Sequence, residues 1–556
     1  MKKHTFTKTV VVLISNFIML STFAVAGVIH VPQDQPTIQE GINASAKGDT
    51  VLVAENTYYE NISFVGKAIT VASHFIVDGD TNHINNTIID GSRPSNPDIG
   101  SVVSFVTPGE DTTSVLMGFT ITGGTGTSVS GGGYTDKNGG GILVRYPGAK
   151  IVKNKIIKNH ITTDGDIYAG GAAIAATNAF GSLVIRDNII CDNSATTTGS
   201  AQSYATVGVN TKNLCIVENN RIYNNVLNAP NASGFAAGLL VDGWKNKAGA
   251  YIIRNNIIHN NKIDSEKGGG GGVVIQNCSP LFYNNIVSEN KAASWGGGGI
   301  WITHYRVDND VVAPKPRIFN NTIINNSTTG SGGGVLLGSS SDSYAYLLNN
   351  IVWGNSAEQN AQIGKYNGAV IKVCYSIVQG NYSGARNSSQ DPLLEADSLG
   401  NASPAIGIGT LEYDFGDSVV LQCPSFDIHG RARPFPLGST PDIGAWESTL
   451  NSPATGIDPE TVAEIPGRFA LYPNYPNPFN PTTIIKYTVP STAQSQIVRL
   501  MVYDLLGRKV ATLVDEKQKP GAYQVEFDAG KLPSGIYIYK LETGAFKASR
   551  KMMLLQ

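Results

Sequence analysis

Short aliphatic pairs flanked by asparagine recur along the middle of the chain. The first clear copy is Asn154-Lys155-Ile156-Ile157-Lys158-Asn159. The later pairs are Ile189-Ile190, Ile222-Tyr223, Ile257-Ile258, Ile286-Val287, Ile323-Ile324, Ile351-Val352 and Ile377-Val378. Their spacing runs from 26 residues (351 to 377) to 37 residues (286 to 323). Such a period is typical of a stacked architecture, in which each unit buries its apolar face only against its neighbours.

A second element, a glycine cluster followed by alternating aliphatic residues, lies between the asparagine steps. It occurs at 139–144, 170–174, 238–241, 268–275, 296–302 and 332–337. Each period therefore holds at least two short strands separated by turn-forming glycine and asparagine, without a helical period between them. The pattern predicts an all-β, repetitive fold.

Successive strands without crossover helices can stack in parallel only if the chain winds as a coil. Each turn then bonds to the next at about 4.8 Å, and equivalent residues form ladders along the axis. Asparagine suits such a ladder because it tolerates left-handed backbone angles and its amide can bond to the turns above and below. We therefore expect asparagine ladders at the corners.

Residues 28–447 resemble the right-handed parallel β-helix proteins of the pectate-lyase-like superfamily. The opening segments 29–42, 48–54 and 66–71 look like that family's usual entry. The resemblance implies about ten coils, plugged at the open end by a short amphipathic helix over residues 36–46, with Ile38 and Ile42 on one face. Residues 403–406 and 441–447 are similar to the family's closing segments, although Gly407 stands where an Asp is common.

The composition changes after Glu447. Residues 448–468 are rich in Pro, Ser, Thr and acidic residues and are predicted to be a linker. Residues 469–556 show alternating strands that predict a small antiparallel β-sandwich, which by pattern alone is an adhesion module of no particular kind. The blocks 476–481, 502–508 and 532–537 closely resemble the type A C-terminal sorting domain of type IX secretion. That resemblance implies passage through the secretion translocon and handling by surface-attachment machinery.

The start of the chain has the pattern of a secretory signal peptide. Lys2, Lys3 and Lys8 precede an apolar run at 10–20, and small residues at 24–26 predict cleavage before Gly27. An uncleaved membrane anchor is the alternative, which Ser15 and the small-residue site disfavour. We expect a secreted protein, extracellular or attached to the cell surface.

Charge and cysteine usage exclude some classes of partner. Charged residues make up 15% of the chain and the net charge is −2, so no footprint for nucleic acid is present. The five cysteines lack metal-ligand spacing, which excludes a zinc signature. They are interpreted as small buried residues, with a Cys191–Cys215 bridge left open. A monomer is expected.

Polar residues that follow the glycine-cluster strands form the candidate site. Aligning those strands places Arg145, Ala175, Asp242, Gln276, Thr303 and Gly338 in one column. The loop over residues 301–317 is the longest excursion, and Trp244 and Tyr305 are expected two coils, or about 10 Å, apart. Aromatic faces beside polar groups suit a carbohydrate; solvated loops without a ligand are the alternative. The candidate substrate-binding residues are Arg145, Asp242, Trp244, His304, Tyr305, Arg306, Asp308 and Asp310.

The candidate residues do not identify a catalytic group. The pairs Asp78/Asp80, Asp164/Asp166 and Asp308/Asp310 each supply only part of a Ca²⁺ shell, so Ca²⁺ stays an open cofactor. The resemblance implies that a lyase would use an arginine or a lysine as the base, whereas a hydrolase would need two carboxyl groups about 5 to 9.5 Å apart. The leading hypothesis is a β-helix that binds an extracellular polysaccharide, with lyase or hydrolase activity left open. The alternative is a non-catalytic structural or adhesive surface protein.

Overall fold

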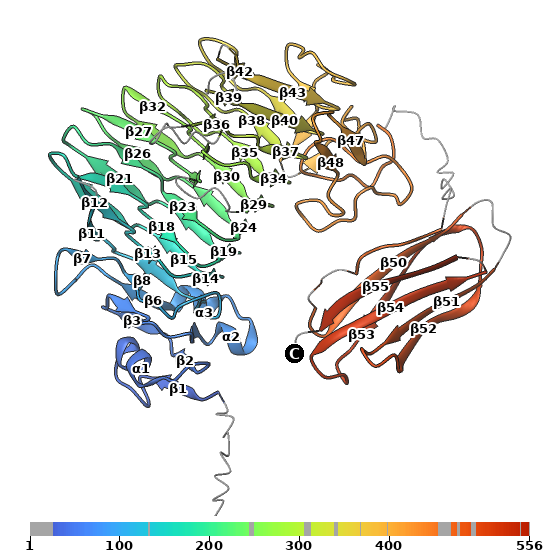
Figure 1. The fold of residues 1–556 in the computed structure, drawn as a ribbon, viewed down its shortest axis with the longest axis horizontal. Helices are drawn as coiled ribbons and strands as arrows, with labels where there is room; N and C mark the ends of the chain where they lie inside the picture. Colours follow the sequence, from blue (N-terminus) through green and yellow to red (C-terminus); the bar gives the residue numbers. More distant parts are fainter. Residues whose placement is uncertain are drawn as a thin grey trace, which may run out of the picture.

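The computed structural model describes residues 26–453 and 469–554, apart from gaps at 132–133, 244–249, 305–312, 339–342, 367, 397, 475–476, 478, 491–495 and 545. Almost all of the predicted signal peptide and most of the predicted linker lie outside these residues. The chain is nearly all-β, with 3% helix, and forms a parallel β-solenoid of about nine turns followed by antiparallel sheets (Figure 1). The predicted fold class is confirmed. In the described part of the chain, no helix is both long and apolar enough to span a membrane.

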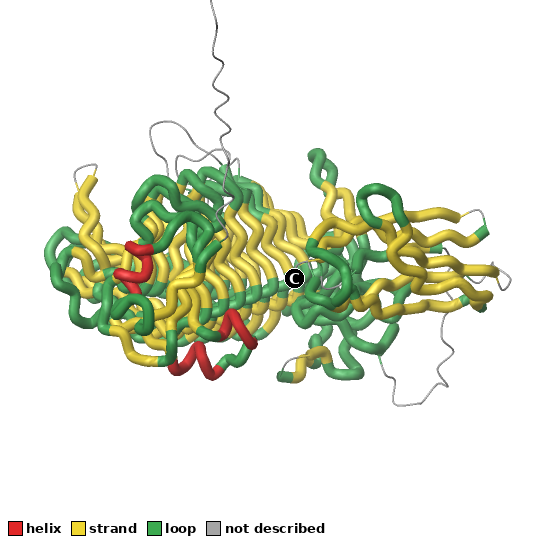
Figure 2. Tube along the Cα trace, turned by 90° about the horizontal axis from the view of Figure 1, so that it is seen from below, coloured by secondary structure: helices red, strands yellow, loops and turns green. Residues whose placement is uncertain are grey.

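Three long parallel sheets run along the solenoid, stacked as rows of strands (Figure 2). Sheet A consists of β1 (Val28–Val31), β2 (Thr50–Val53), β5 (Thr70–Ser73), β9 (Val115–Met117), β14 (Ala149–Val152), β19 (Leu183–Arg186), β24 (Cys215–Glu218), β29 (Tyr251–Arg254), β34 (Leu281–Tyr283), β37 (Arg317–Phe319), β40 (Tyr344–Leu348) and β43 (Val370–Cys374). Sheet B consists of β3 (Asn56–Tyr58), β6 (Thr87–Asp90), β10 (Thr120–Thr122), β15 (Lys155–Ile157), β20 (Ile189–Cys191), β25 (Arg221–Tyr223), β30 (Ile257–His259), β35 (Ile286–Ser288), β38 (Thr322–Ile324), β41 (Ile351–Trp353) and β44 (Ile377–Val378). Sheet C consists of β4 (Ile62–Ser63), β8 (Val103–Phe105), β13 (Ile142–Arg145), β18 (Ile174–Ala179), β23 (Val207–Thr211), β28 (Leu239–Asp242), β33 (Val273–Gln276), β36 (Ile300–Thr303), β39 (Val335–Leu337) and β42 (Ile363–Lys365).

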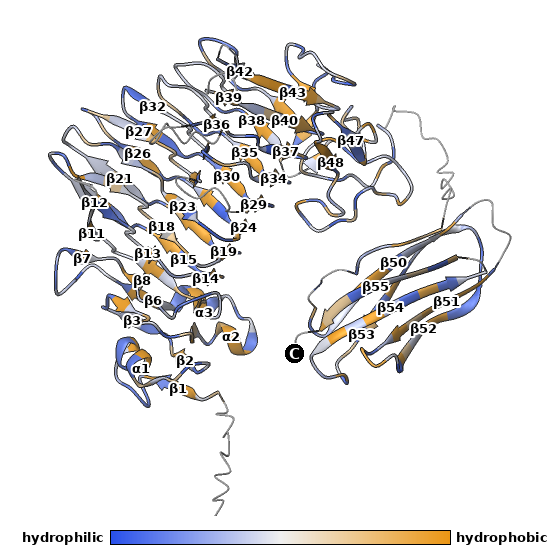
Figure 3. Ribbon diagram, in the orientation of Figure 1, coloured by the Kyte–Doolittle hydropathy of each residue, from blue (hydrophilic) through white to orange (hydrophobic). Residues whose placement is uncertain are grey.

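Along each strand, every second side chain points into the solenoid. In sheet A, Ile151 pairs with Ile185, which pairs with Val217, and all three are fully buried. The same register puts Lys150, Val184 and Ile216 on the outer face, where each is half-buried. This alternation gives the sheets their banded hydropathy (Figure 3) and sets one continuous core along the axis.

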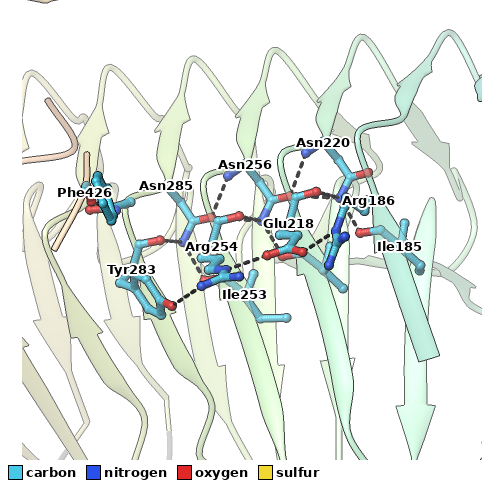
Figure 4. Close-up of polar contacts among 12 residues, drawn as sticks. Ile185, Arg186, Glu218, Asn220, Ile253, Arg254, Asn256, Tyr283, Asn285 and Phe426 are labelled. Carbon is cyan, nitrogen blue, oxygen red and sulfur yellow. Dashed lines mark hydrogen bonds and ion pairs between the residues drawn. The ribbon is translucent and has the colours of Figure 1, made fainter. Parts of the chain in front are cut away.

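Two buried asparagine ladders hold the corners on either side of sheet B. The first contains Asn154, Asn188, Asn220, Asn256, Asn285, Asn321 and Asn350, and the second contains Asn159, Asn193, Asn225, Asn261, Asn290, Asn326 and Asn355. Each side-chain oxygen accepts the backbone N–H and the amide of the preceding member, as Asn256 does from Asn220 at 3.0 Å for both contacts (Figure 4). The predicted ladders are therefore present.

The left-handed backbone angle belongs to the residue before each ladder asparagine. Lys153, Asp187 and Asn219 have φ of 58°, 57° and 57°, whereas the ladder residues after them are not left-handed. The expectation that one asparagine both takes the left-handed backbone angle and forms the ladder bonds is thus wrong. Two successive residues divide the tasks: one takes the left-handed backbone angle and the next forms the ladder bonds.

A row of alternating charges lies on the outer face of sheet A. The Glu218 carboxylate, 4% exposed, forms ion pairs with Arg186 and Arg254, and the Arg254 contact measures 2.6 Å. Arg254 also donates to the hydroxyl of Tyr283 at 3.0 Å (Figure 4). Since two cations flank one buried anion, the row binds adjacent strands without leaving the carboxylate uncompensated.

The N-terminal end is closed by a helix. α1 (Ile38–Ala44) buries Ile38 and Ile42 completely, as predicted. Thr37 caps it: its hydroxyl accepts the Glu40 N–H at 3.1 Å and donates to the Glu40 carboxylate at 3.1 Å. Two shorter helices, α2 (Phe75–Asp78) and α3 (Asn82–Asn86), follow β5.

A buried carboxyl near this end predicts a pH dependence of stability. Glu110 accepts the backbone N–H of Gly66 at 2.8 Å and of Thr107 at 3.2 Å. Burial outweighs these bonds and raises the pKa of Glu110 to about 7. Because the folded pKa lies above the ordinary value of 4.5, the stability from this group is complete below about pH 4.5 and is lost as pH rises through about 7.

Glu110→Gln should remove this dependence. Between about pH 5 and 8 the free energy of unfolding of the wild type should fall by up to about 3 kcal/mol more than that of the variant. Chemical denaturation followed by circular dichroism at several pH values measures the difference. Parallel pH profiles for the two proteins would contradict the assignment.

The C-terminal end is closed by residues 388–450, which include β45 (Leu394–Glu395), β46 (Ser398–Leu399), β47 (Glu412–Asp414) and β48 (Val420–Gln422). Left-handed asparagines in the last turns bond to this cap: Asn284 donates to Phe426 O at 2.7 Å and Asn349 donates to Thr410 O at 2.8 Å. Inside the cap, Arg433 and Glu447 form a fully buried ion pair at 3.0 Å. Gly407 has a φ of 68°, which explains a glycine at that position.

Two smaller sheets form a side lobe over the outer face of sheet C. Side sheet D consists of β7 (Ile99–Gly100), β11 (Gly126–Gly131), β12 (Tyr134–Asn138), β17 (Tyr168–Gly170), β22 (Ser203–Tyr204), β27 (Ser233–Phe235) and β32 (Lys267–Gly269). Side sheet E consists of β16 (His160–Thr163), β21 (Ser194–Thr197), β26 (Val226–Asn228) and β31 (Lys262–Asp264). Phe235 of the lobe contacts Trp301 of sheet C, with ring centroids 5.0 Å apart. The lobe thereby packs on the outer face of sheet C, where Leu240, Val274, Trp301 and Leu336 belong to the shared apolar cluster.

The C-terminal unit is an antiparallel β-sandwich. One sheet contains β49 (Ala470–Leu471), β50 (Thr482–Val489) and β53 (Gly521–Asp528), and the other contains β52 (Lys509–Gln518), β51 (Gln496–Tyr503), β54 (Gly535–Thr543) and β55 (Phe546–Leu554). Its core includes the fully buried Tyr487 and Tyr539. This core is separate from that of the solenoid.

Candidate ligand-binding edge of sheet C

The candidate edge lies where the strands of sheet C end, and its register differs from the prediction at one position. Asp242 pairs with Gln276, which pairs with Thr303, as expected. Arg145 pairs with Thr177 rather than with Ala175. The reason is that Ala172 and Ala173 occupy the corner positions of Gly140 and Gly141, so the strand begins two residues later than the glycine pattern predicts.

The structure describes three of the candidate site residues. Trp244, Tyr305, Arg306, Asp308 and Asp310 lie outside the described residues. Arg145 and Asp242 end β13 and β28, three strands apart, and His304 follows β36, two strands beyond β28. Strand spacing puts about 14 Å between the first pair and about 10 Å between the second. The three described residues therefore share one edge without touching.

Two exposed aromatic rings stack along this edge between two cations. Tyr146 and Phe180 are 40% and 48% exposed, with ring centroids 6.0 Å apart and an interplanar angle of 9°. The Arg145 guanidinium lies 4.9 Å from the Tyr146 ring and the Lys212 ammonium lies 4.1 Å from the Phe180 ring. We call these four residues the cation–aromatic stack. Because cations cover the outer ring faces, the stack presents ring edges and positive charge to solvent.

Further along the edge, Asp242 is held by amide groups. Its carboxylate accepts from the side chains of Asn210 at 3.2 Å and Asn277 at 3.3 Å, and all three residues are buried. The hydroxyl of Tyr251 contacts the Asp242 backbone carbonyl at 2.9 Å. Because the Asn210 and Asn277 amides fix the Asp242 carboxylate, it is a hydrogen-bond acceptor in a set position.

A second carboxyl group lies in the side lobe, close enough to Arg145 for the two charges to interact. Burial raises the pKa of Asp136, whereas Asn138, Tyr204 and the charge of Arg145 lower it. The Tyr204 hydroxyl lies 2.7 Å from the Asn138 side-chain oxygen and 3.4 Å from the Asp136 carboxylate. Asp136 therefore belongs to the same electrostatic neighbourhood as the cation–aromatic stack.

These two carboxyl groups do not form a glycosidase pair. Asp136 lies in the turn of β13, three turns from Asp242, which is about 14 Å along the axis. Glycoside hydrolysis needs two carboxyl groups about 5 to 9.5 Å apart.

Among the described residues no group of three or more His, Cys, Asp or Glu side chains could hold a metal ion. Of the D-x-D pairs, Asp78 contacts His83 at 3.1 Å and Asp166 accepts from Ser200. All five cysteines are free, so the Cys191–Cys215 bridge is not formed.

Residues 474–555, nearly the whole sandwich, match the family described as the secretion system C-terminal sorting domain. The chain ends in a sorting domain. This domain marks export by type IX secretion to the cell surface or the extracellular space, as predicted, and implies handling by the type IX secretion system. Among curated proteins, none matches the chain significantly. The sorting domain carries the delivery signal, and the edge of sheet C belongs to the cargo that it exports.

Several residues of the edge escaped prediction. Phe180 and Lys212 were not predicted, although a lone aromatic residue between Ala179 and Gly181 in a polar turn is a usable signal. The sequence gives no sign of Asp136 at this site, because only the folded lobe brings its carboxyl group within electrostatic range of Arg145. In contrast to the sorting domain, whose motifs are continuous in sequence, this edge is assembled from separate turns.

Proposed function

We propose that this protein is a secreted or surface-attached β-solenoid that binds an extracellular polysaccharide along the edge of sheet C. The observation that supports it is the cation–aromatic stack, which places aromatic edges and two cations on successive turns. The exposed ring edges offer apolar contact to sugars, and the two cations can bind sugar hydroxyl or acidic groups. Asp242 with its two amides adds a fixed acceptor farther along the same line.

Binding without catalysis is favoured over lyase or hydrolase activity. The described carboxyl groups of the edge are too far apart for glycoside hydrolysis. Arg145 lies against the Tyr146 ring, a contact that positions its guanidinium. A purely structural role of the solenoid as a rigid spacer is the competing function, favoured by the tight asparagine ladders.

A binding measurement distinguishes these functions. The mature chain is screened on a glycan array, and the best glycan is titrated against Tyr146→Ala/Phe180→Ala. We expect the affinity of this double variant to fall at least about tenfold, because both ring contacts are lost. Tyr59→Ala is the matched control, since Tyr59 is 50% exposed and also lies under an arginine, Arg93, but follows a strand of sheet B rather than a strand of sheet C.

Three outcomes decide the proposal. Absence of binding to every glycan would favour the spacer function. Binding that survives the double variant would reject this edge as the site. Release of unsaturated uronate products, followed by absorbance with and without Ca²⁺, would show that the protein is a lyase.

A further inference from the structure

The sorting domain exposes two leucines at the turn between β51 and β52. Leu505 is 64% exposed and Leu506 is 78% exposed, the highest value for any large hydrophobic residue in the described part of the chain. Single exposed apolar residues are common, whereas grouped ones mark interaction sites. The question is therefore whether other apolar residues lie beside them.

The neighbouring strands add apolar side chains at the same end of the sheet. Tyr503 pairs with Ile538, and Ile536, two residues nearer the turn, pairs with Met553 of β55. Ile536 and Met553 are 38% and 40% exposed, whereas the residues next to them, Tyr537 and Met552, point into the core. We call Leu505, Leu506, Ile536 and Met553 the apolar end patch.

The turn that carries the leucines is held rigidly. The Asp504 carboxylate accepts the backbone N–H groups of Leu506 and Arg508, both at 2.9 Å, and pairs with the Arg508 side chain at 2.7 Å. Gly507 has a φ of 77°, which only glycine adopts without strain. The leucines are thus displayed in a fixed geometry, which lowers the entropy cost of binding.

Positive charge borders the patch. Lys509 follows the turn and Lys551 pairs with Ile538, and both are exposed. An apolar centre with a basic rim is complementary to a groove that has an apolar floor and acidic margins.

We propose that the apolar end patch is the surface by which the sorting domain docks on a protein of the type IX secretion machinery, in an apolar groove with an acidic rim. The sorting domain is handled by that machinery, and this patch holds the two most exposed large apolar side chains among the described residues of the domain. The core residues of the sandwich set its fold, whereas the leucines contribute nothing to that core.

The test uses the full chain in a bacterium that has type IX secretion. In Leu505→Ser/Leu506→Ser we expect the fraction of the chain outside the outer membrane to fall at least about tenfold, with accumulation in the periplasm. The matched control is Ile497→Ser, because Ile497 is 47% exposed on the same sheet but at its opposite end. Immunoblots of periplasmic, surface and medium fractions measure the distribution.

Further measurements separate a docking defect from other causes. The purified double variant should melt within about 2 °C of the wild type, because exposed substitutions away from the core change stability little. If the double variant unfolds instead, the docking surface is tested with Lys509→Glu/Lys551→Glu. This second variant leaves the leucines intact and should also reduce export. Unchanged export in both variants would overturn the proposal. Leucine-dependent flotation of the wild type with phosphatidylglycerol vesicles, or leucine-dependent dimerisation, would also overturn it in favour of a membrane or a second copy.

Discussion

Replacing Asn256 with alanine is expected to lower the local stability of the solenoid by about 3 kcal/mol. Asn256 is fully buried, and its amide donates to Val217 O at 2.8 Å, Arg254 O at 2.9 Å and Asn285 Oδ1 at 3.0 Å. Alanine leaves the backbone N–H and the amide of Asn220 without their shared acceptor. A buried polar group without a partner costs about 1–3 kcal/mol, and several are created at once.

Hydrogen exchange measures this loss where it occurs. A solenoid is stabilised turn by turn, so the amides of β24, β29 and β34 should exchange about a hundredfold faster, whereas the turns near α1 should change little. Asn255→Gly is the matched control: its φ of 55° suits glycine, and the ladder amide stays intact. Equal exchange in both variants would show that the ladder contributes no more than the turn conformation does.

The asparagine repeat predicts the stack because its chemistry is periodic. Every turn meets the same corner, so the same residue recurs and the sequence displays the architecture directly. The repeat does not show that Lys153 or Asp187 takes the left-handed angle while the next asparagine bonds. It also does not show that Asn284 and Asn349 hold the C-terminal cap, since residues 61 or more positions apart form those contacts.

The sequence predicts which strand-end residues of the candidate edge align along the axis, but much less well which residues the turns and the side lobe add to it. Asp242, Gln276 and Thr303 align because register follows from the buried alternation of each strand. Ala175 is misplaced by two residues because alanines replace corner glycines in that turn. Phe180, Lys212 and Asp136 join the edge through turns and a lobe whose lengths vary, and length variation hides such neighbours from a sequence pattern.

The charged row of sheet A shows the same limit. Arg186, Glu218 and Arg254 occupy equivalent positions on β19, β24 and β29. Their intervals, 32 and 36 residues, differ because the turn from sheet C to sheet A is longer after Val241 than after the equivalent Val209. A periodicity search tuned to aliphatic residues passes over them, although their alternating charge stabilises the same stack that the asparagines hold.

Deleting residues 469–556 is expected to abolish export and to retain the protein in the periplasm. The sorting domain has its own core, with 16 fully or nearly buried residues, and the solenoid has another, so removing one leaves the other folded. The predicted signal peptide still delivers the truncated chain across the inner membrane. Immunoblots of cell fractions should therefore show the truncated chain at a normal total level but absent from the surface and the medium.

A reciprocal fusion makes this result specific to the sorting domain. Residues 454–556 joined to a periplasmic reporter should carry that reporter outside the cell, because the delivery signal resides in the sandwich that matches the sorting family. Normal surface display of the truncated chain would refute the assignment. A reporter that stays in the periplasm, together with a truncated chain that also stays there, would mean that export requires the solenoid as well.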